Sequence, residues 1–433
     1  TDQERYVEGS VDVVLESLEK SGLVYDEGPD KDKGYGPYIQ SQRKPIYRQY
    51  AEELVAKGEA YYCFCGKEDK PALEAANERV EGYRDPCRDL SPQQVEARIA
   101  EGIVPVVRQR VPMEGVSAFE DHVYGHIEIE NKQLDDQVLL KSDGFPTYNF
   151  ANVVDDHLMQ ISHVIRGQEY LSSTPKYNLL YEAFGWEHPE YIHLPHIIRE
   201  DGAKMSKRKG DPSFEDLVRM GYLPQAIVNY VALLGWNPGD EREFFLMQDL
   251  IAAFDMDRIN KANAAFSLDK LRWLNGEHIR SLSPETFHEI SLPFYPQGLA
   301  EFDLAKISQL IQVRTETLTD IPKLVGFLAE LPEYSADLFE NQKSKSTRET
   351  SRRVLEAVAP MLESQEDWSN EALFELLKTF AQAQGLKVGT VMWPIRTALS
   401  GQETSPGGAT ELASLMRKEE SLRRIRLGLN KLA

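Results

Sequence analysis

A short basic loop holds the densest group of reactive side chains in the sequence. Residues 201–211, DGAKMSKRKGD, place four lysine or arginine side chains within six positions of a chain whose net charge is −21. Lys204, Lys207 and Arg208 are mobile cations of the kind that stabilises phosphate groups during their transfer. Ser206 adds a hydroxyl donor, and the Gly-x-x-x-x-Gly-Lys-Ser/Thr pattern of a P-loop is absent. The loop is therefore either a polyphosphate site of another kind or an ordinary exposed basic turn.

The three cysteines form a second candidate site. Cys63 and Cys65 are two positions apart, and the stretch YRDPC carries Tyr83 and Cys87. Zinc takes four N, S or O ligands in a tetrahedron, so three thiolates and the Tyr83 oxygen would make a structural site. The alternative is three free thiols. An odd number of cysteines without a disulfide framework predicts a reducing, cytoplasmic location.

Composition limits the class of protein. The 433 residues predict two to four domains, and 41% hydrophobic with 27% charged residues is typical of a soluble globular chain. No apolar run approaches the roughly 20 residues that span a bilayer, and no signal peptide is visible. The acidic balance argues against a uniformly positive DNA-binding surface but leaves room for a local basic face. Residues 343–353 and 422–431 are such clusters, or else solvated helix faces.

The elements that would position these side chains change in type along the chain. Helical periodicity at residues 7–23 and 44–58 is followed by short β-branched segments, which predict strands at 103–112, 126–131 and 136–142. Next come a strand at 163–167, a helix at 173–186 that Ser173 or Thr174 would cap, and a strand at 191–198. This strand–helix–strand order predicts a parallel pair. Beyond residue 213 the pattern is helical almost throughout.

The segment NVVDDH, residues 152–157, brings two carboxylates and a histidine together. These groups could hold a divalent ion. The structural alternative, which we favour, is that Asp155 and Asp156 follow an apolar run and cap the next helix.

Several stretches resemble one protein family. KMSKR followed by KGD resembles the second signature of class I aminoacyl-tRNA synthetases, and the arginine suits the glutamyl and glutaminyl branch. The resemblance to bacterial-type glutamyl-tRNA synthetases covers essentially the whole chain, in order and spacing. The stretches that carry it are YDEGP, GPYIQSQRKPIYRQYAEELVAKGEAYYCFC, VLLKSDGFPTYNFANVVDDH, VIRGQEYLSSTPKYNLLYEAFGW, LLGWNP, KLRWLNGEHI and MWPIRTALSG.

The resemblance implies a fold and a division into domains. It implies an α/β Rossmann-type catalytic domain with an α/β insertion and an all-α C-terminal anticodon-binding half. The helical C-terminal half distinguishes glutamyl from glutaminyl enzymes, which typically end in β-barrels. The implied parts are a Rossmann-type domain at 1–60 and 148–200, a connective insertion at 61–147, a stem-contact domain carrying the KMSKR loop at 201–283, and a helical anticodon-binding region at 284–433.

The resemblance also implies roles for particular residues of the catalytic half. Arg166 would pair with the side-chain carboxylate of glutamate, and Tyr148 and Asn152 would complete the amino-acid pocket. Glu169 would lie near the ATP ribose or adenine, while Lys204, Ser206, Lys207 and Arg208 would serve the phosphates. Without the resemblance, Arg166 would be an ordinary surface ion-pair residue.

Roles in RNA and metal binding are implied as well. Thr1 and Asp2 would help to place the 3′ end of the tRNA. Arg314 would read the anticodon, and Trp393 and Arg396 would contact bases unless Trp393 packs in the core. Some members bind zinc with Cys-x-Cys and a later Cys-x-His, whose histidine position is Asp89 here.

The implied function is a glutamate–tRNA ligase that uses ATP with Mg²⁺ and, if the cysteines bind it, a structural Zn²⁺. Its partners would be tRNA(Glu), L-glutamate and ATP, with no membrane, as a cytoplasmic monomer. The family's His-Ile-Gly-His signature is missing, so we expect an N-terminally truncated chain that is inactive alone. The alternatives are a non-catalytic tRNA-binding paralogue and an enzyme that also charges tRNA(Gln).

Overall fold

The chain forms two compact units, which we describe separately. The computed structural model describes residues 7–66, 84–206 and 209–433, so Thr1, Asp2, Tyr83, Lys207 and Arg208 lie outside the described residues. Unit 1 comprises residues 1–209 and 231–266, and unit 2 comprises residues 210–230 and 267–433. The four-part division expected from the sequence stays a prediction. No described helix is long and apolar enough to cross a membrane.

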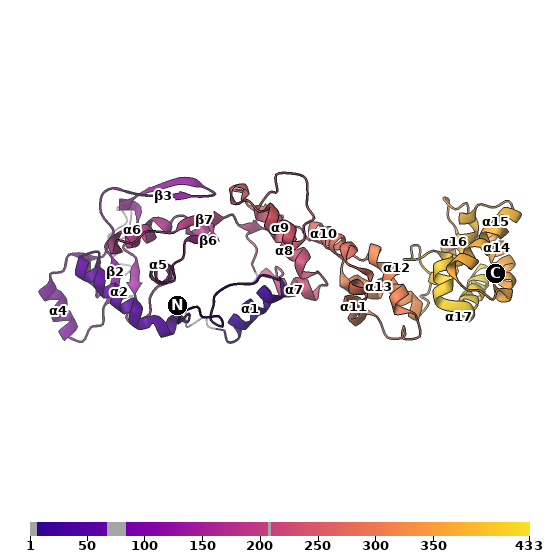
Figure 1. Ribbon diagram of the computed structural model, residues 1–433, viewed down its shortest axis with the longest axis horizontal. Helices are drawn as coiled ribbons and strands as arrows, with labels where there is room; N and C mark the ends of the chain where they lie inside the picture. Colours follow the sequence, from indigo (N-terminus) through magenta and orange to yellow (C-terminus); the bar gives the residue numbers. More distant parts are fainter. Residues whose placement is uncertain (1–6, 67–83, 207–208) are drawn as a thin grey trace. The chain divides into compact units, whose positions relative to one another are not determined.

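Unit 1 mixes helices and strands (Figure 1). Its helices are α1 (Ser10–Lys20), α2 (Lys44–Lys57), α4 (Pro92–Ala100), α5 (Tyr148–Leu158), α6 (Thr174–Phe184) and α9 (Met247–Ala253). Its strands are β1 (Ala60–Cys63), β2 (Val106–Gln109), β3 (Val116–Asp121), β4 (Gly125–Glu130), β5 (Val138–Leu140), β6 (His163–Gly167), β7 (Glu190–Leu194), β8 (Ile197–Ile198) and β9 (Ala264–Ala265).

Three sheets organise these strands. One has the order β1-β2-β5, the second β4-β3-β7-β6, and the third pairs β8 with β9. The predicted parallel pair is confirmed, because β6 and β7 run parallel with Arg166 opposite His193. Helix α6 connects the two strands. It begins after Ser173, whose side chain makes no capping hydrogen bond, and it ends at Gly185 in the left-handed region.

The core of unit 1 lies between α2, α5, α6 and strand β5. One face of each helix supplies it, as amphipathic helices do when they pack on a sheet. The buried side chains include Tyr47, Leu54, Leu139, Phe150, Val154, Tyr177, Leu180 and Tyr181. Thr174, the first residue of α6, contacts Arg166 on β6.

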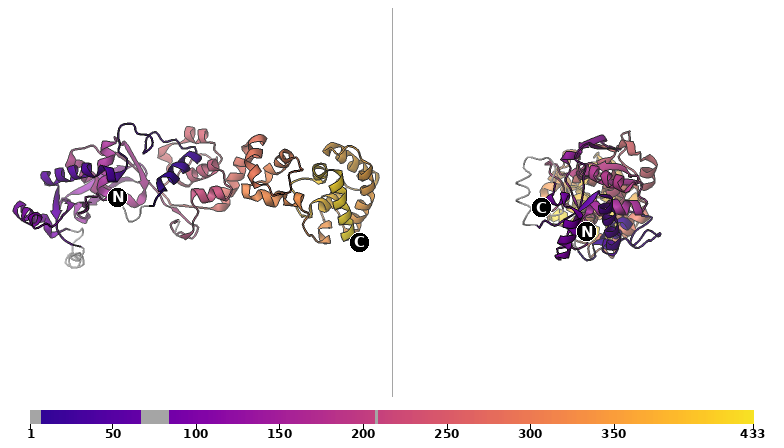
Figure 2. Two further views of the ribbon diagram at one scale, coloured as in Figure 1. Left: turned by 90° about the horizontal axis from the view of Figure 1, so that it is seen from below. Right: turned by 90° about the vertical axis from the view of Figure 1, so that its left-hand side faces the viewer.

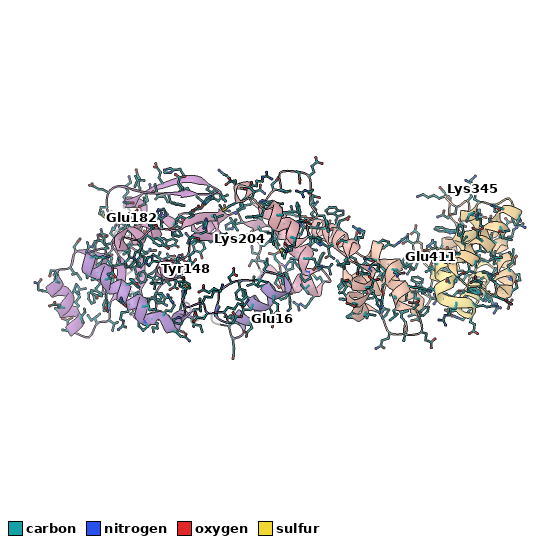
Figure 3. All side chains as sticks on the ribbon, in the orientation of Figure 1. Glu16, Tyr148, Glu182, Lys204, Lys345 and Glu411 are labelled. Atoms are coloured by element: carbon teal, nitrogen blue, oxygen red, sulfur yellow. The ribbon has the colours of Figure 1, made fainter. Side chains whose placement is uncertain are left out.

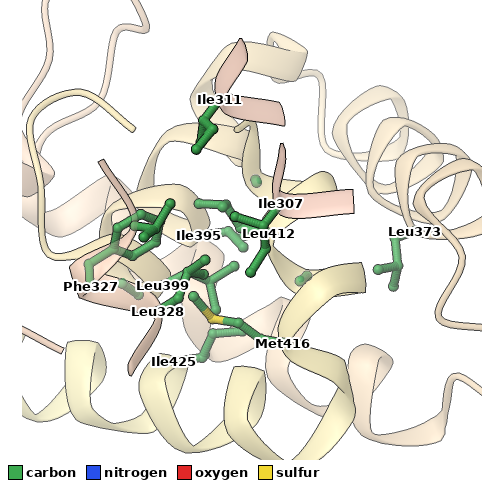
Figure 4. Packing of buried hydrophobic residues seen from close by; sticks show 14 of the residues in the cluster. Ile307, Ile311, Phe327, Leu328, Leu373, Ile395, Leu399, Leu412, Met416 and Ile425 are labelled. Atoms are coloured by element: carbon green, nitrogen blue, oxygen red, sulfur yellow. The ribbon is translucent and has the colours of Figure 1, made fainter. Parts of the chain in front are cut away.

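Unit 2 is helical throughout its described residues (Figures 1 and 2). Its helices are α7 (Phe214–Arg219), α10 (Leu268–Ser281), α11 (Pro284–Ser291), α12 (Leu304–Ile311), α13 (Ile321–Ala329), α14 (Arg348–Ser364), α15 (Asn370–Ala383), α16 (Val388–Ser400) and α17 (Ala409–Leu432), while α8 (Pro224–Gly235) belongs partly to each unit. Figure 4 shows aliphatic and aromatic side chains of α12, α13, α16 and α17 packed into one core. The prediction of a helical C-terminal half is confirmed.

Candidate active site

Arg166 lies on β6 with one edge of its guanidinium held by the protein. Its Nε donates to His193 Nε2 at 3.2 Å, and its Nη2 donates to Thr174 Oγ1 at 2.7 Å. Among the described residues, no acceptor contacts the opposite edge, which Nη1 and the second Nη2 hydrogen form. That edge has the two-pronged shape that matches a carboxylate.

Tyrosine rings surround this guanidinium. Its central carbon lies 4.7 Å from the ring centre of Tyr177, 5.2 Å from that of Tyr170 and 5.6 Å from that of Tyr191. Tyr148, the predicted pocket residue, is the first residue of α5 (Figure 3). Its ring packs 5.4 Å from that of Tyr170. Burial raises the pKa of Tyr177 to about 12, so this tyrosine remains neutral near neutral pH. The arrangement is an aromatic box around a single cation.

Helix α5 adds one buried polar atom without a hydrogen-bond partner and one carboxyl group with a raised pKa. The Oδ1 atom of Asn152 is buried and has no hydrogen-bond partner in the described structure. Burial raises the pKa of the Asp156 carboxyl to about 6, Arg166 opposes that rise, and Asp155 adds to it. Such groups are costly unless something pairs with them, so they mark a site that takes a polar ligand.

The expectation that Asp155 and Asp156 cap a helix is wrong. Both lie inside α5, which continues to Leu158. Asp155 instead accepts hydrogen bonds from Arg43 at 2.8 Å and from Tyr47 at 2.7 Å, because α2 packs against this part of α5. The apolar run before the two carboxylates is thus the buried face of their own helix.

Lys204 and Glu169, both predicted to bind ATP, lie together. Lys204 Nζ is 3.3 Å from Glu169 Oε1, and His196 Nδ1 is 3.6 Å from the other carboxylate oxygen. A backbone hydrogen bond and the nearby Lys204 hold the pKa of Glu169 below its ordinary range. Glu169 and His196 follow the carboxyl ends of the parallel strands β6 and β7, the edge where α/β sheets bind ligands.

The loop that carries Lys204 is a tight turn after β8. Gly202 donates from its backbone to Arg199, and Asp201 accepts from the backbone N–H of Ala203 at 3.0 Å. Gly202 has φ +81°, a conformation that side chains other than glycine rarely adopt. Its neighbour Lys204 is 58% exposed, and Ser206 is half-buried. The turn therefore presents Lys204 to solvent beside Glu169.

The three cysteines converge with one residue that the sequence did not single out. Ligand atoms of Cys63, Cys65, Asp85 and Cys87 all lie within 4.8 Å of one another. Cys63 Sγ is 3.0 Å from Asp85 Oδ2, and the Cys65 and Cys87 sulfurs are 3.6 Å apart. Tetrahedral Zn–S bonds of about 2.3 Å place sulfurs roughly 3.8 Å apart, so the donor set fits zinc. Burial, with Asp85 nearby, raises the pKa of Cys63 to about 11.

The residues predicted to contact tRNA divide into two groups in unit 2. Arg396 stacks 4.4 Å from the Trp393 ring and donates to the backbone of Gln402 and Glu403. The Trp393 indole donates to the carbonyl of Leu338 at 2.9 Å. Both side chains thus make contacts within the fold, and their contact with tRNA stays a prediction.

Arg314 is the exception in this group. It is exposed, has no hydrogen-bond or ion-pair partner in the described structure, and lines a hollow of about 510 Å³. The hollow also includes Lys323, which likewise lacks a described partner, and the 402–406 loop.

Comparisons with known proteins agree with this geometry. Residues 1–273 match the family described as "tRNA synthetases class I (E and Q), catalytic domain", and residues 286–429 match an anticodon binding domain. The chain is 52% identical to a glutamate–tRNA ligase of Clostridium botulinum, covering 100% of this chain and 90% of that one. A glutamate–tRNA ligase of Clostridium acetobutylicum is 48% identical with the same coverage.

Solved structures give the same result. The crystal structure of a glutamate tRNA ligase from Elizabethkingia meningosepticum, in complex with its amino acid, matches with a TM-score of 0.87. It is 32% identical, and the match covers 100% of this chain and 91% of that chain. A glutamate–tRNA synthetase from Elizabethkingia anophelis matches equally well, with 99% of this chain covered.

Proposed function

The chain belongs to the glutamate–tRNA ligases of the class I tRNA synthetase family, and we propose that it activates L-glutamate with ATP and transfers it to tRNA(Glu). The observation that carries the substrate assignment is the open edge of Arg166 inside its box of tyrosines. A cytoplasmic monomer is part of this proposal.

In the first step the α-carboxylate of glutamate attacks the α-phosphorus of ATP, and pyrophosphate leaves. Lys204 lies at the carboxyl edge of β6 and β7, where its ammonium would stabilise charge on the phosphates. Lys207 and Arg208, outside the described residues, would act alongside it. Mg²⁺ would arrive with ATP and neutralise phosphate charge. The tRNA's terminal ribose hydroxyl then takes the acyl group and releases AMP.

Selection of glutamate follows from the chemistry of Arg166. A guanidinium pairs with the side-chain carboxylate through two charge-assisted hydrogen bonds, whereas the neutral amide of glutamine offers one acceptor and two donors. The free Asn152 Oδ1 would accept a hydrogen bond from the substrate's ammonium group, and Tyr148 would close the pocket.

We assign reading of the anticodon to Arg314 and its hollow. An exposed, unpaired guanidinium can hydrogen-bond a base edge or a phosphate without first breaking a contact within the protein. Whether tRNA(Gln) is also charged depends on this contact.

We also propose that Cys63, Cys65, Asp85 and Cys87 hold a structural Zn²⁺. Metal binding would take the thiol protons off despite the raised pKa of Cys63. We expect about one equivalent of zinc by mass spectrometry, and a loss of zinc in Cys65→Ser. Asp85→Asn should weaken zinc binding. Unchanged zinc content in that variant would indicate that Tyr83, as expected from the sequence, supplies the fourth ligand.

The function is tested, with a His-Ile-Gly-His segment restored at the N-terminus, by glutamate-dependent ATP–pyrophosphate exchange, with and without tRNA, and by charging of tRNA(Glu) and tRNA(Gln). Lys204→Ala should lower the exchange rate about 100-fold. Lys132→Ala is the matched control, since Lys132 is similarly exposed and pairs with Glu130. Binding of tRNA without any ATP use would indicate a non-catalytic paralogue instead.

A further inference from the structure

The acceptors that hold Arg166 are deeply buried. Thr174 and His193 are both fully inaccessible to solvent, yet each directs a polar atom at the guanidinium. Thr174 donates its own hydroxyl hydrogen to the carbonyl of Tyr170 at 2.9 Å, so its oxygen remains an acceptor for Arg166. These contacts fix the plane of the guanidinium from behind.

His193 can accept from Arg166 in only one tautomer, and Asp121 selects it. The Asp121 Oδ2 atom lies 2.6 Å from His193 Nδ1 and 3.1 Å from the His193 backbone N–H. A carboxylate there requires a proton on Nδ1, which leaves the Nε2 lone pair for Arg166.

Asp121 is itself held in the charged form. Its other oxygen accepts from the backbone N–H groups of Val123 and Tyr124 at 3.0 and 2.9 Å. Burial alone would raise the pKa of Asp121, but the bonds from His193 and these two N–H groups hold it below its ordinary value of 3.8. The pair therefore has one stable hydrogen-bond direction, from Arg166 through His193 to Asp121.

We propose that Asp121 and His193 are positioning residues that orient Arg166 so that its open edge meets the side-chain carboxylate of the substrate. The inference rests on the proposed function and extends it to two residues that do not touch the substrate. His193, held by Asp121, occupies one edge of the guanidinium together with Thr174, which limits the substrate to the other edge. An arginine free to rotate would lose part of its geometric advantage over a lysine.

Two substitutions of His193 separate positioning from packing. The carbonyl oxygen of glutamine reaches the place of Nε2 and can accept from Arg166, whereas asparagine places its amide near Nδ1 and keeps only the contact with Asp121. Neither amide side chain fills the buried space of the imidazole ring, so both variants should have a lower melting temperature. If His193 only fills space, the two variants should have similar KM values for glutamate. If His193 positions Arg166, these KM values should differ.

The experiment measures KM and kcat for glutamate and KM for ATP in the exchange reaction. We expect His193→Asn to raise KM for glutamate about tenfold or more, because a hydrogen bond to a charged group is lost. His193→Gln should recover most of that loss, and KM for ATP should stay within about twofold in both variants. Equal KM values for glutamate in the two variants, or a parallel rise in KM for ATP, would overturn the proposal.

If either histidine variant fails to fold, two substitutions of Thr174 provide a second comparison. Thr174→Ser keeps the hydroxyl acceptor, and Thr174→Val keeps the shape without it. A higher KM for glutamate in the valine variant alone would support the proposal, and equal values would contradict it. If the wild-type protein shows no glutamate-dependent exchange with a His-Ile-Gly-His segment restored at its N-terminus, the proposed function has failed, which is distinct from a wild-type enzyme indifferent to these changes.

Discussion

Two arginines, one buried in unit 2 and one half-buried in unit 1, differ in how completely the protein satisfies their donors. In unit 2, Arg424 is 1% exposed; its Nε pairs with Glu420 at 2.6 Å and its other nitrogens donate to three backbone carbonyls. In unit 1, Arg166 makes two hydrogen bonds to side chains and keeps one edge open. The first pattern stabilises a fold, and the second leaves a binding site ready for a ligand.

The same distinction holds within the anticodon-binding unit. Arg396 donates to the backbone of the 402–405 loop, whereas Arg314 beside it has no described partner. Desolvation, with the nearby Arg314 charge, lowers the pKa of Arg396, so two like charges lie close together. The hydrogen-bond partners of each arginine thus distinguish arginines that the fold holds from arginines whose donors stay open. The sequence alone does not make this distinction.

The largest expected effect is on stability, from Arg424→Met. Removing the guanidinium leaves buried carbonyls of residues 327, 328 and 399 without donors. We expect a loss of about 3–5 kcal/mol in the free energy of unfolding, measured by urea denaturation. Arg423→Met is the matched control, because Arg423 is 56% exposed and shares Glu420. Equal losses in the two variants would contradict the distinction.

A smaller effect is expected from Asp156→Asn, and it should depend on pH. The pKa of Asp156 is raised from 3.8 to about 6 in the folded protein, so folding favours the protonated carboxyl. The stability that this raised pKa gives to the folded state is complete below pH 3.8 and is lost as the pH rises through 6. The asparagine variant should gain about 2 kcal/mol relative to wild type between pH 4 and pH 8, with allowance for residual solvent contact. Calorimetry showing a difference independent of pH would disprove this assignment.

The smallest effects should divide between Arg396 and Arg314. Arg396→Ala should cost about 1–2 kcal/mol of stability, because the 402–405 loop loses its donors. Arg314→Ala should leave stability within about 0.5 kcal/mol but lower kcat/KM for tRNA about tenfold. Aminoacylation assays and thermal melts on both variants test this difference. If both variants lose only stability, or both lose only tRNA charging, the difference between the two arginines is contradicted.

Much of the fold follows from local pattern. Helix α2 ends at Gly58 as expected, and the β6–α6–β7 unit could be predicted because a helical pattern connects two short strand patterns, although the expected side-chain cap at Ser173 is absent. Strand β3 was missed, although its burial alternates along its length, because an acidic, partly exposed segment lacks a β-branched run. Its pairing with β7 joins residues about 70 positions apart, which periodicity does not reveal.

The candidate site was predictable to a lesser degree. The resemblance supplied Arg166, Glu169 and Lys204, and the structure brings the last two together. Asp121 and His193 carry no sequence signal of their own. His193 meets Arg166 only when β6 and β7 pair, and Asp121 meets His193 only when β3 pairs with β7. The sequence pattern pointed to Tyr83 as the fourth ligand and gave no signal for Asp85, which precedes a short helix and lies beside Cys63 only in the folded chain.

The most direct test of the role of Arg166 is calorimetric binding of glutamate and glutamine to wild type and Arg166→Gln. Wild type should prefer glutamate strongly, and the variant should lose about 100-fold in glutamate affinity while its melting temperature changes little. Unchanged glutamate affinity in a folded Arg166→Gln protein would contradict the assignment of Arg166 as the residue that recognises the substrate's carboxylate.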